Sequence, residues 1–210
     1  MKTIQLKICG VRSAGEAKQL NELKVGYIGL NFIPTSSRCI SLDMAESIMN
    51  ELSHGDSKTV GLFAGHPAEV VINYAQRLGM DYVQLHGNEP ADYALKLKTP
   101  VIRAIAVDPD SSAYDLIRFI DSYPAEFFVL DRPMQGQGDI VNMKLASKII
   151  SARPDKIFLA GGLTPSNLNK VLSSLQTYPY GIDIAGGVRT SSNDLDTNKV
   201  SSCLGILNTV

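Results

Sequence analysis

This sequence lacks the charge bias and the long apolar runs that mark several functional classes. Its 210 residues carry 20 Lys and Arg against 21 Asp and Glu, and the net charge of −1 at pH 7 offers no broad basic surface for nucleic acid or an anionic membrane. No apolar run approaches the ~18 residues of a membrane span. Residues 1–5 lack the apolar region of a signal peptide. We therefore expect no nucleic-acid partner and no membrane attachment.

Cysteine and histidine are also scarce. The three cysteines, Cys9, Cys39 and Cys203, are odd in number and far apart, which fits neither a disulfide framework nor a zinc knuckle. We interpret Cys39 and Cys203 as packing residues. The three histidines show no ligand spacing, so we predict no metal site. Scattered thiols of this kind are typical of a reducing compartment, and we expect a cytoplasmic protein.

What the sequence does contain is a regular alternation of short apolar runs with longer segments of helical spacing. The apolar runs cover residues 4–8, 27–32, 59–63, 82–85, 101–106, 127–130, 157–159 and 180–184. The helical segments cover residues 14–23, 42–52, 68–78, 91–97, 113–120, 141–150, 166–175 and about 200–207. Strict alternation predicts a parallel sheet, and eight uninterrupted units predict a single (β/α)8 TIM barrel domain over residues 1–210. An open doubly wound sheet is the alternative, and no glycine-rich dinucleotide fingerprint follows the first strand to favour it.

Strand parity predicts which polar side chains face the inside of this barrel, because successive residues of a strand point to opposite faces. The inward residues at the carboxyl ends of the strands are Cys9, Asn31, His86, Asp131 and Asp183. These ends form the mouth where barrel enzymes place their chemistry. Lys7 and Arg103 are expected deeper in the barrel, as buried cations that need acidic or polar partners.

Two glycine pairs follow the last two strands. The first pair is Gly161 and Gly162, and the second is Gly186 and Gly187. Glycine lets backbone N–H groups approach an anion closely, and the loops after strands seven and eight of this fold form a common phosphate site. Glycine at a strand end is also an ordinary turn residue, but two pairs at these positions favour a phosphorylated ligand.

Two residues at the predicted mouth are candidates for acid–base chemistry. Cys9 is either a small buried apolar residue or a thiolate base, and Lys7 on the same face could lower its pKa. Asp131 ends a strand of large apolar residues, so it is either a general acid or the structural partner of a buried cation.

Three further residues are candidates for substrate contacts. Asp183 has the same two interpretations as Asp131, and the structural one is favoured. His86 could contact substrate or cap its own loop, with equal weight. Arg38, in a polar loop after the second strand, could bind a substrate carboxylate through its planar fork, or be an ordinary solvated charge.

Several short motifs together resemble one known family over nearly the whole chain, from Lys7 to about Val188. They are Lys7-Ile8-Cys9-Gly10, Gly29-Leu30-Asn31-Phe32, Ser37-Arg38-Cys39-Ile40-Ser41, Val60-Gly61-Leu62-Phe63, Val83-Gln84-Leu85-His86-Gly87-Asn88-Glu89, Val129-Leu130-Asp131, Leu159-Ala160-Gly161-Gly162-Leu163-Thr164-Pro165 and Gly181-Ile182-Asp183. In this order they resemble the phosphoribosylanthranilate isomerase family of tryptophan biosynthesis.

The resemblance implies an Amadori rearrangement of N-(5-phosphoribosyl)anthranilate to 1-(2-carboxyphenylamino)-1-deoxyribulose 5-phosphate without a cofactor. It implies that Asp131 is the general acid that opens the ribose ring and that Cys9 is the general base that removes the C2 proton. It further implies that Arg38 holds the anthranilate carboxylate and that the glycine loops bind phosphate. An acid and a base on opposite walls suit two separated proton transfers. The family includes monomers and homodimers.

Two loops depart from the family pattern. After the sixth strand the family has a Gly-Gly-Thr-Gly-like run and then Phe-Asp-Trp, where this chain has Gly136-Gln137-Gly138-Asp139-Ile140-Val141-Asn142. After the eighth strand the family has two serines and then Gly-Val-Glu, where this chain has Ala185-Gly186-Gly187-Val188-Arg189. Arg189 is a candidate for an added phosphate contact. These departures concern loop geometry and substrate affinity.

Two alternative functions stay open at this point. One is another sugar-phosphate isomerase or epimerase barrel, although metal-dependent epimerases use more histidines, and the histidine-pathway isomerase has an aspartate where this chain has Cys9. The other is a degenerate phosphate-binding barrel that acts as a metabolite sensor. Turnover of the substrate separates these possibilities.

Overall fold

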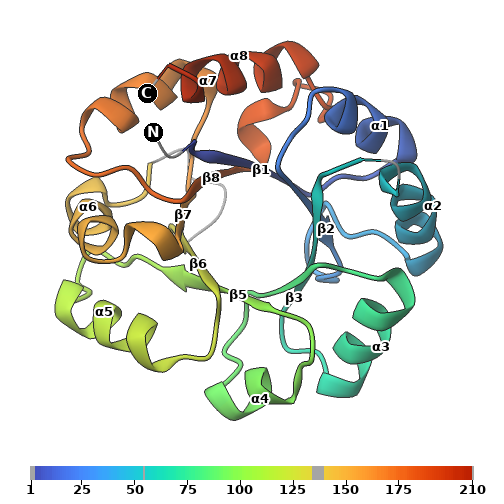
Figure 1. Cartoon of the computed structure of the whole chain (residues 1–210), viewed down its shortest axis with the longest axis horizontal. Coiled ribbons are helices and arrows are strands. Elements are labelled where there is room, and N and C mark those ends of the chain that lie inside the picture. The colour runs from blue at the N-terminus through green and yellow to red at the C-terminus, as the bar shows by residue number, and fades with distance from the viewer. Residues whose placement is uncertain (1–2, 54, 134–139, 210) are drawn as a thin grey trace. The chain divides into compact units, whose positions relative to one another are not determined.

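The computed structural model describes residues 3–53, 55–133 and 140–209, and within them the chain alternates eight strands with eight α-helices. The strands are β1 (Gln5–Cys9), β2 (Tyr27–Asn31), β3 (Lys58–Phe63), β4 (Tyr82–Leu85), β5 (Val101–Ala106), β6 (Phe127–Asp131), β7 (Ile157–Leu159) and β8 (Gly181–Ile184). They follow one another in a closed parallel barrel, β1 to β8 (Figure 1). The prediction of a (β/α)8 barrel is confirmed, and the open doubly wound sheet is excluded.

Each strand is followed by a helix, as the alternation predicted. The helices are α1 (Ala14–Glu22), α2 (Leu42–Leu52), α3 (Ala68–Leu78), α4 (Ala91–Lys96), α5 (Ala113–Ser122), α6 (Met143–Ala152), α7 (Pro165–Ser173) and α8 (Thr197–Leu207), with short 3-10 turns η1 (Pro154–Lys156) and η2 (Gly186–Val188). None of the helices in the described ranges is long and apolar enough to cross a membrane.

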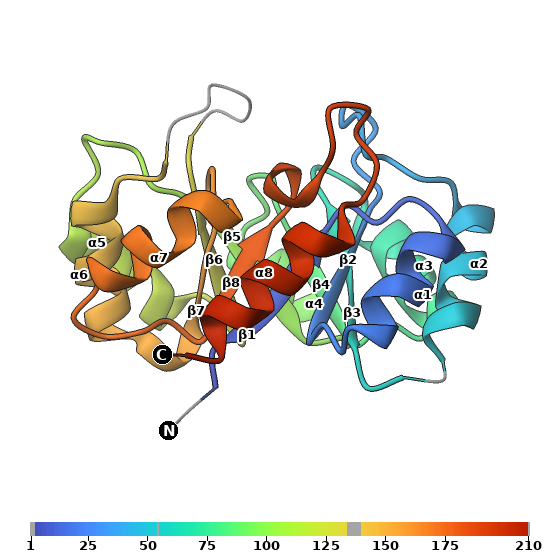
Figure 2. The same ribbon diagram turned by 90° about the horizontal axis from the view of Figure 1, so that it is seen from above.

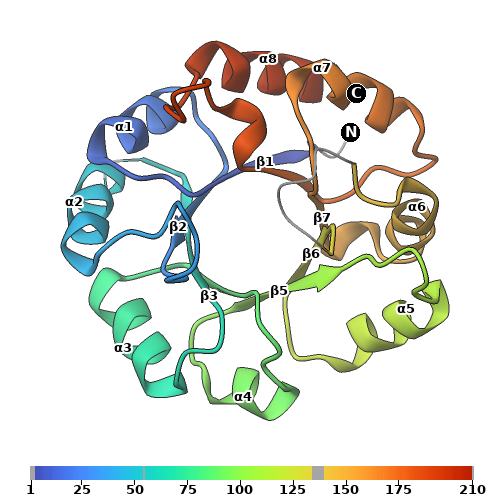
Figure 3. The same cartoon turned by 180° about the vertical axis from the view of Figure 1, so that it is seen from behind.

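The chain divides into two compact units. The first unit contains Lys7–Arg103 and Pro124–Glu126, and the second contains Met1–Leu6, Ala104–Tyr123 and Phe127–Val210. In the first unit the helices α2 and α3 lie on the outer side of β2 and β3 (Figure 3). In the second unit the helices α5 to α8 lie beside the strands β5 to β8 (Figure 2).

The core of the first unit comes from strands that are buried on both faces. All five residues of β2 are buried, and so are Lys7, Ile8 and Cys9 of β1. This is the expected burial of a parallel barrel, whose strands are covered by helices outside and by side chains inside. Cys9 pairs in register with Gly29 of β2. Because Gly29 has no side chain, the Cys9 sulfur has room beside it: a Cβ there would lie 3.2 Å from Sγ.

The core of the second unit is built around aromatic rings. The rings of Phe127 in β6 and Tyr180 before β8 stack with centroids 4.4 Å apart. Phe158 of β7 meets Phe127 edge to face at 5.6 Å and Tyr180 at 5.2 Å. Such pairs add roughly 0.5–1.5 kcal/mol each beyond the burial of their area, and they join three strands of this unit.

Hydrogen bonds at the helix ends explain where prediction and structure differ. Helix α6 begins at Met143, two residues later than predicted, because the Asn142 side chain caps it by accepting from the N–H of Leu145 at 3.2 Å. Helix α8 begins earlier than predicted, at Thr197, because Asp196 caps it. The predicted stop of α3 is confirmed, since Gly79 adopts the left-handed φ of 61° that glycine tolerates at a helix end.

Candidate active site

The predicted base ends the first strand. Cys9 is the last residue of β1 and is 7% exposed, and Lys7 before it is fully buried. Gly10 then turns the chain with a φ of 80°, a conformation that favours glycine, and its N–H donates to the Gly29 carbonyl at 2.9 Å. The burial predicted for Lys7 is confirmed. The role of Cys9 as a base stays a prediction.

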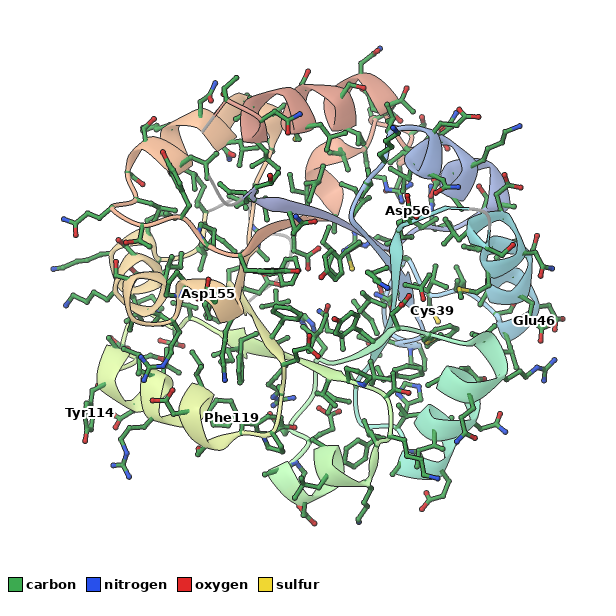
Figure 4. The ribbon with its side chains drawn as sticks, in the orientation of Figure 1. Cys39, Glu46, Asp56, Tyr114, Phe119 and Asp155 are labelled. Atoms are coloured by element: carbon green, nitrogen blue, oxygen red, sulfur yellow. The ribbon has the colours of Figure 1, made fainter. Side chains whose placement is uncertain are left out.

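Arg38 lies against the strand that carries this thiol. A Cβ built at Gly10 would collide with Cδ of Arg38 and lie 3.0 Å from its Nε. The structure therefore brings the predicted carboxylate-binding residue to the residue next to Cys9. The following residue, Cys39, is exposed and is labelled in Figure 4. It forms a β-bridge with Asn31 at the end of β2. Cys39 was expected to be a packing residue, and its exposure shows that expectation to be wrong.

The loop between β2 and α2 is fixed by side-chain hydrogen bonds. Asn31, the last residue of β2, is 6% exposed and its Nδ2 donates to Ser36 Oγ at 3.1 Å. Ser36 Oγ also accepts from the N–H of Arg38 at 3.2 Å. The sequence predicted that Asn31 lies at the mouth of the barrel, but the link through Ser36 was not foreseen.

His86 follows β4, and a buried carboxylate fixes the loop that carries it. Glu89 is 7% exposed, and its Oε2 accepts from the N–H of Gly87 at 3.0 Å and from Nη1 of Arg103 at 2.8 Å. Its Oε1 accepts from the N–H of Gly65, after β3, at 2.7 Å. Arg103 is 8% exposed, so the predicted buried cation and its acidic partner are both found.

The sequence alone did not identify Glu89 as that partner. The available signals were the expectation that Arg103 needs an acid and the presence of Glu89 in the motif around His86. The folding back of the carboxylate depends on Gly87, where a Cβ would lie 2.5 Å from Glu89 Oε1 and 3.0 Å from the Gly65 nitrogen. One carboxylate therefore joins the ends of β3 and β4 to Arg103 within β5 (Val101–Ala106).

The predicted acid lies in the second unit, at the end of β6. Asp131 is half-buried, and its Oδ1 accepts from the N–H of Arg132 at 2.8 Å. Its backbone carbonyl accepts from the N–H of Val107 at 2.8 Å. A Cβ at Gly161 would lie 3.2 Å from Oδ1 of Asp131. The structure thus brings the predicted acid against the first glycine of the predicted phosphate loop.

The two glycine pairs also meet within this unit. Gly161 and Gly162 have φ values of 86° and 73°, so this turn needs glycine. A Cβ at Gly187 would collide with the Leu163 carbonyl oxygen, so the loop after β8 packs against the loop after β7. Within the described residues, the N–H groups of Gly161, Gly162, Gly186 and Gly187 donate no hydrogen bond. Four backbone donors are thus available for an acceptor outside the described residues.

Asp183 and Arg189 complete the candidates in the second unit. Asp183 lies within β8 and is 7% exposed. Arg189 is 5% exposed, and its Nη1 donates to the Asn193 carbonyl at 3.3 Å, so at least one guanidinium nitrogen holds the loop after η2. The substituted run after the sixth strand begins at Gly136, and its residues 136–139 lie outside the described residues.

The remaining thiol has no place among these candidates. Cys203 of α8 is fully buried, and burial raises the pKa of its thiol to about 11. A thiol with that pKa stays protonated at neutral pH and is a poor nucleophile or base. The prediction that Cys203 is a packing residue is confirmed.

Comparison with known proteins identifies relatives along the whole barrel. Residues 6–205 match the family model described as N-(5'phosphoribosyl)anthranilate (PRA) isomerase. The curated N-(5'-phosphoribosyl)anthranilate isomerase of Pelobacter propionicus is 30% identical over 207 residues, which cover 97% of this chain and 95% of that protein.

Solved structures agree with the sequence relatives. The crystal structure of phosphoribosyl anthranilate isomerase from Thermus thermophilus superposes with a TM-score of 0.84 at 27% identity, covering 98% of this chain and 99% of that one. A second solved phosphoribosyl anthranilate isomerase, in complex with reduced 1-(o-carboxyphenylamino)-1-deoxyribulose 5-phosphate, superposes with a TM-score of 0.80 at 25% identity and covers 99% and 100% of the two chains.

Proposed function

The chain belongs to the N-(5'-phosphoribosyl)anthranilate isomerase family, an isomerase family of tryptophan biosynthesis, and we propose that Cys9 and Asp131 are its general base and general acid. The substrate is N-(5-phosphoribosyl)anthranilate and the product is 1-(2-carboxyphenylamino)-1-deoxyribulose 5-phosphate. One observation carries the assignment most directly: a thiol ends β1 while a guanidinium packs on the adjoining Gly10. The substrate presents a proton to remove and a carboxylate to bind.

The reaction begins with proton donation from Asp131. The carboxylic acid protonates the ribose ring oxygen, the bond from C1 to that oxygen breaks, and the nitrogen lone pair forms an iminium. A carboxyl group at the end of a strand and beside the backbone of Gly161 is held in a fixed position, which general acid catalysis requires. The fold thus positions the acid before substrate binds, so its orientation costs no further entropy during the reaction.

Cys9 then removes the C2 proton. The electron pair of the C2–H bond neutralises the iminium and gives an enolamine, which tautomerises to the ketone. Only the thiolate can act in this way, so the thiol must lose its proton before the step. The buried Lys7 and the guanidinium of Arg38 are the cations of this strand end that favour the thiolate by charge.

The remaining candidates bind the substrate. Arg38 holds the anthranilate carboxylate, and His86 and Asp183 are further substrate contacts. The N–H groups of the two glycine pairs bind the phosphate, which is supported by their lack of acceptors within the described residues. No cofactor enters this scheme.

Other properties follow the family and the composition. We propose a cytoplasmic protein, because three scattered thiols suit a reducing compartment. We propose that residues 1–210 act as one catalytic domain, because the family model spans residues 6–205. One related isomerase from Thermotoga maritima is described as dimeric, and we propose that this chain is a monomer or a homodimer of the same kind.

Turnover of phosphoribosylanthranilate tests the proposal. The purified chain should consume this fluorescent substrate, and Cys9→Ser and Asp131→Asn should each lower kcat by at least about a hundredfold, the usual contribution of a positioned acid or base. Cys39→Ser is the matched control, because Cys39 is the exposed thiol, and it should keep full activity. Binding without turnover in the unmodified chain would favour the sensor, and a fully active Cys9→Ser would exclude Cys9 as the base.

A further inference from the structure

The loop after β2 is held by a single buried amide. Asn31 accepts from the N–H of Ile33 through Oδ1 at 2.8 Å and donates through Nδ2 to Ser36 Oγ at 3.1 Å. Its own carbonyl accepts from the N–H of Ile40 at 2.9 Å. Asn31 as a whole is 6% exposed, and buried hydrogen bonds of this kind are costly to break without replacement. The path of the loop is therefore set from its first residue.

The hydroxyl of Ser36 connects Asn31 to the backbone of Arg38. Its hydroxyl oxygen accepts from Asn31 Nδ2 and from the N–H of Arg38 at 3.2 Å, which uses both of its acceptor positions. The N–H of Ser36 donates to the Ile33 carbonyl, and the N–H of Cys39 donates to the Ser36 carbonyl, each at 3.0 Å. Two successive tight turns thus centre on Ser36. The backbone of Arg38 has little freedom to move while that hydroxyl is present.

The side chain of Arg38 is fixed from the other side. Its Cδ and Nε lie against Gly10, where any Cβ would collide with Cδ. The Nε is buried and has no hydrogen-bond partner among the described residues. A buried guanidinium N–H without an acceptor costs free energy until an acceptor arrives. Arg38 is therefore held in place at its backbone and its stem, with donor capacity left for an anion.

We propose that Asn31 and Ser36 are positioning residues that hold Arg38 ready for the aromatic carboxylate of the substrate. The inference rests on the proposed function of Arg38 and goes beyond it, since it assigns selectivity for that carboxylate to a hydrogen-bond chain within one loop. A planar guanidinium binds a carboxylate through two parallel hydrogen bonds, and such pairing is lost when the fork is misplaced. Without this chain the loop would have to order itself when substrate binds, and affinity would fall.

Ser36→Ala and Ser37→Ala form a matched pair for the test. Ser37 is exposed, lies in the same loop and has no side-chain hydrogen bond among the described residues. Ser36→Ala should raise KM for phosphoribosylanthranilate about tenfold, the value of one or two lost hydrogen bonds, while kcat stays within about twofold. Ser37→Ala should match the unmodified chain, and Ser36→Thr, which keeps the hydroxyl, should restore most of the affinity.

A substrate without the carboxylate separates positioning from a general structural role. With N-(5-phosphoribosyl)aniline, Ser36→Ala and Asn31→Val should have the same KM as the unmodified chain. Equal losses on both substrates, or a Ser36→Ala that behaves like Ser37→Ala, would overturn the inference. If the unmodified chain does not turn over phosphoribosylanthranilate at all, the proposed function itself fails, and that outcome is distinct from an unchanged Ser36→Ala in an active enzyme.

Discussion

Two carboxylates tie β3 to β4, one at each end of this strand pair, and they differ mainly in burial. Asp81, before β4, accepts from the N–H of Thr59 at 2.9 Å, from Thr59 Oγ1 at 3.0 Å and from Lys58 Nζ at 3.0 Å. Glu89, after β4, likewise has three donors, but two of them are backbone N–H groups, of Gly65 and Gly87, and the third is Arg103. The side chain of Asp81 is 32% exposed and that of Glu89 is 4% exposed.

Each carboxylate therefore bonds a cation and backbone groups, but the two lie in different surroundings. Solvent at the amino ends of the strands screens the pair of Asp81 with Lys58, whose side chain is 53% exposed, so this pair contributes little by itself. At the carboxyl ends, the pair of Glu89 with Arg103 has been removed from water, and each partner depends on the other. In barrels of this fold, residues at the amino ends of the strands contribute to stability and residues at the carboxyl ends contribute to catalysis. The burial of these two carboxylates follows that division.

Removal of the buried carboxylate should have the largest effect on stability. Glu89→Ala takes the acceptor from Arg103 and from two backbone N–H groups, and should lower the free energy of unfolding by about 3–5 kcal/mol. Urea denaturation measures the loss. Glu89→Gln keeps one acceptor oxygen and should lose less. Activity should fall in both variants, because the loop that carries His86 loses its anchor, and a stable, fully active Glu89→Ala would contradict this picture.

Removal of the exposed carboxylate should have a smaller effect. Asp81→Ala takes the acceptor from the N–H and the hydroxyl of Thr59, a residue that is 4% exposed, and should cost about 1–2 kcal/mol in the same urea experiment. Because Asp81 lies at the amino ends, kcat and KM should not change. A loss of stability as large as that of Glu89→Ala would remove the distinction between the two ends.

The smallest effect should be the change in stability with pH that comes from the ionisation of Asp81. Burial alone would raise the pKa of Asp81, but hydrogen bonds from Thr59 and Lys58 outweigh it, and the pKa is lowered. A carboxyl group with a lowered folded pKa stabilises the fold above its unfolded pKa of about 4, and that stability is lost as the pH falls through the folded value.

Comparison of the unmodified chain with Asp81→Asn isolates the contribution of the Asp81 charge to the free energy of unfolding. The difference between their urea midpoints should be present at pH 7 and should shrink below about pH 4. Asn keeps the size and one acceptor oxygen, so packing is the same in both proteins. A difference that stays constant down to about pH 3 would mean that the charge of Asp81 does not contribute.

Much of this architecture could be predicted from the sequence, because strands and helices each have a characteristic spacing of apolar residues. The bounds of the apolar runs also predicted Cys9 and Asp131 at the carboxyl ends of β1 and β6, where the structure has them. Helix ends shifted by a few residues where a side chain such as Asn142 or Asp196 caps the first turn. The roles assigned to Cys9 and Asp131 themselves stay predictions.

The contacts inside loops could not be predicted in the same way. The bonds from Glu89 depend on a reversal of the chain at Gly87, and the bonds of Ser36 depend on two successive turns. Neither feature repeats along the chain, so no periodic signal reports it. The nearest local signal was Asn31 at a strand end, since asparagine often accepts from the N–H two residues later, as it does here with Ile33.

The contact between the two glycine loops has a consequence for protein engineering. Gly187 packs directly on the carbonyl of Leu163, so a side chain at position 187 would displace the loop after β7. The loops after β7 and β8 are therefore one exchangeable module. A barrel assembled from fragments of different parents should keep its phosphate loops only when the crossover lies outside residues 160–188, so that both are inherited from the same parent.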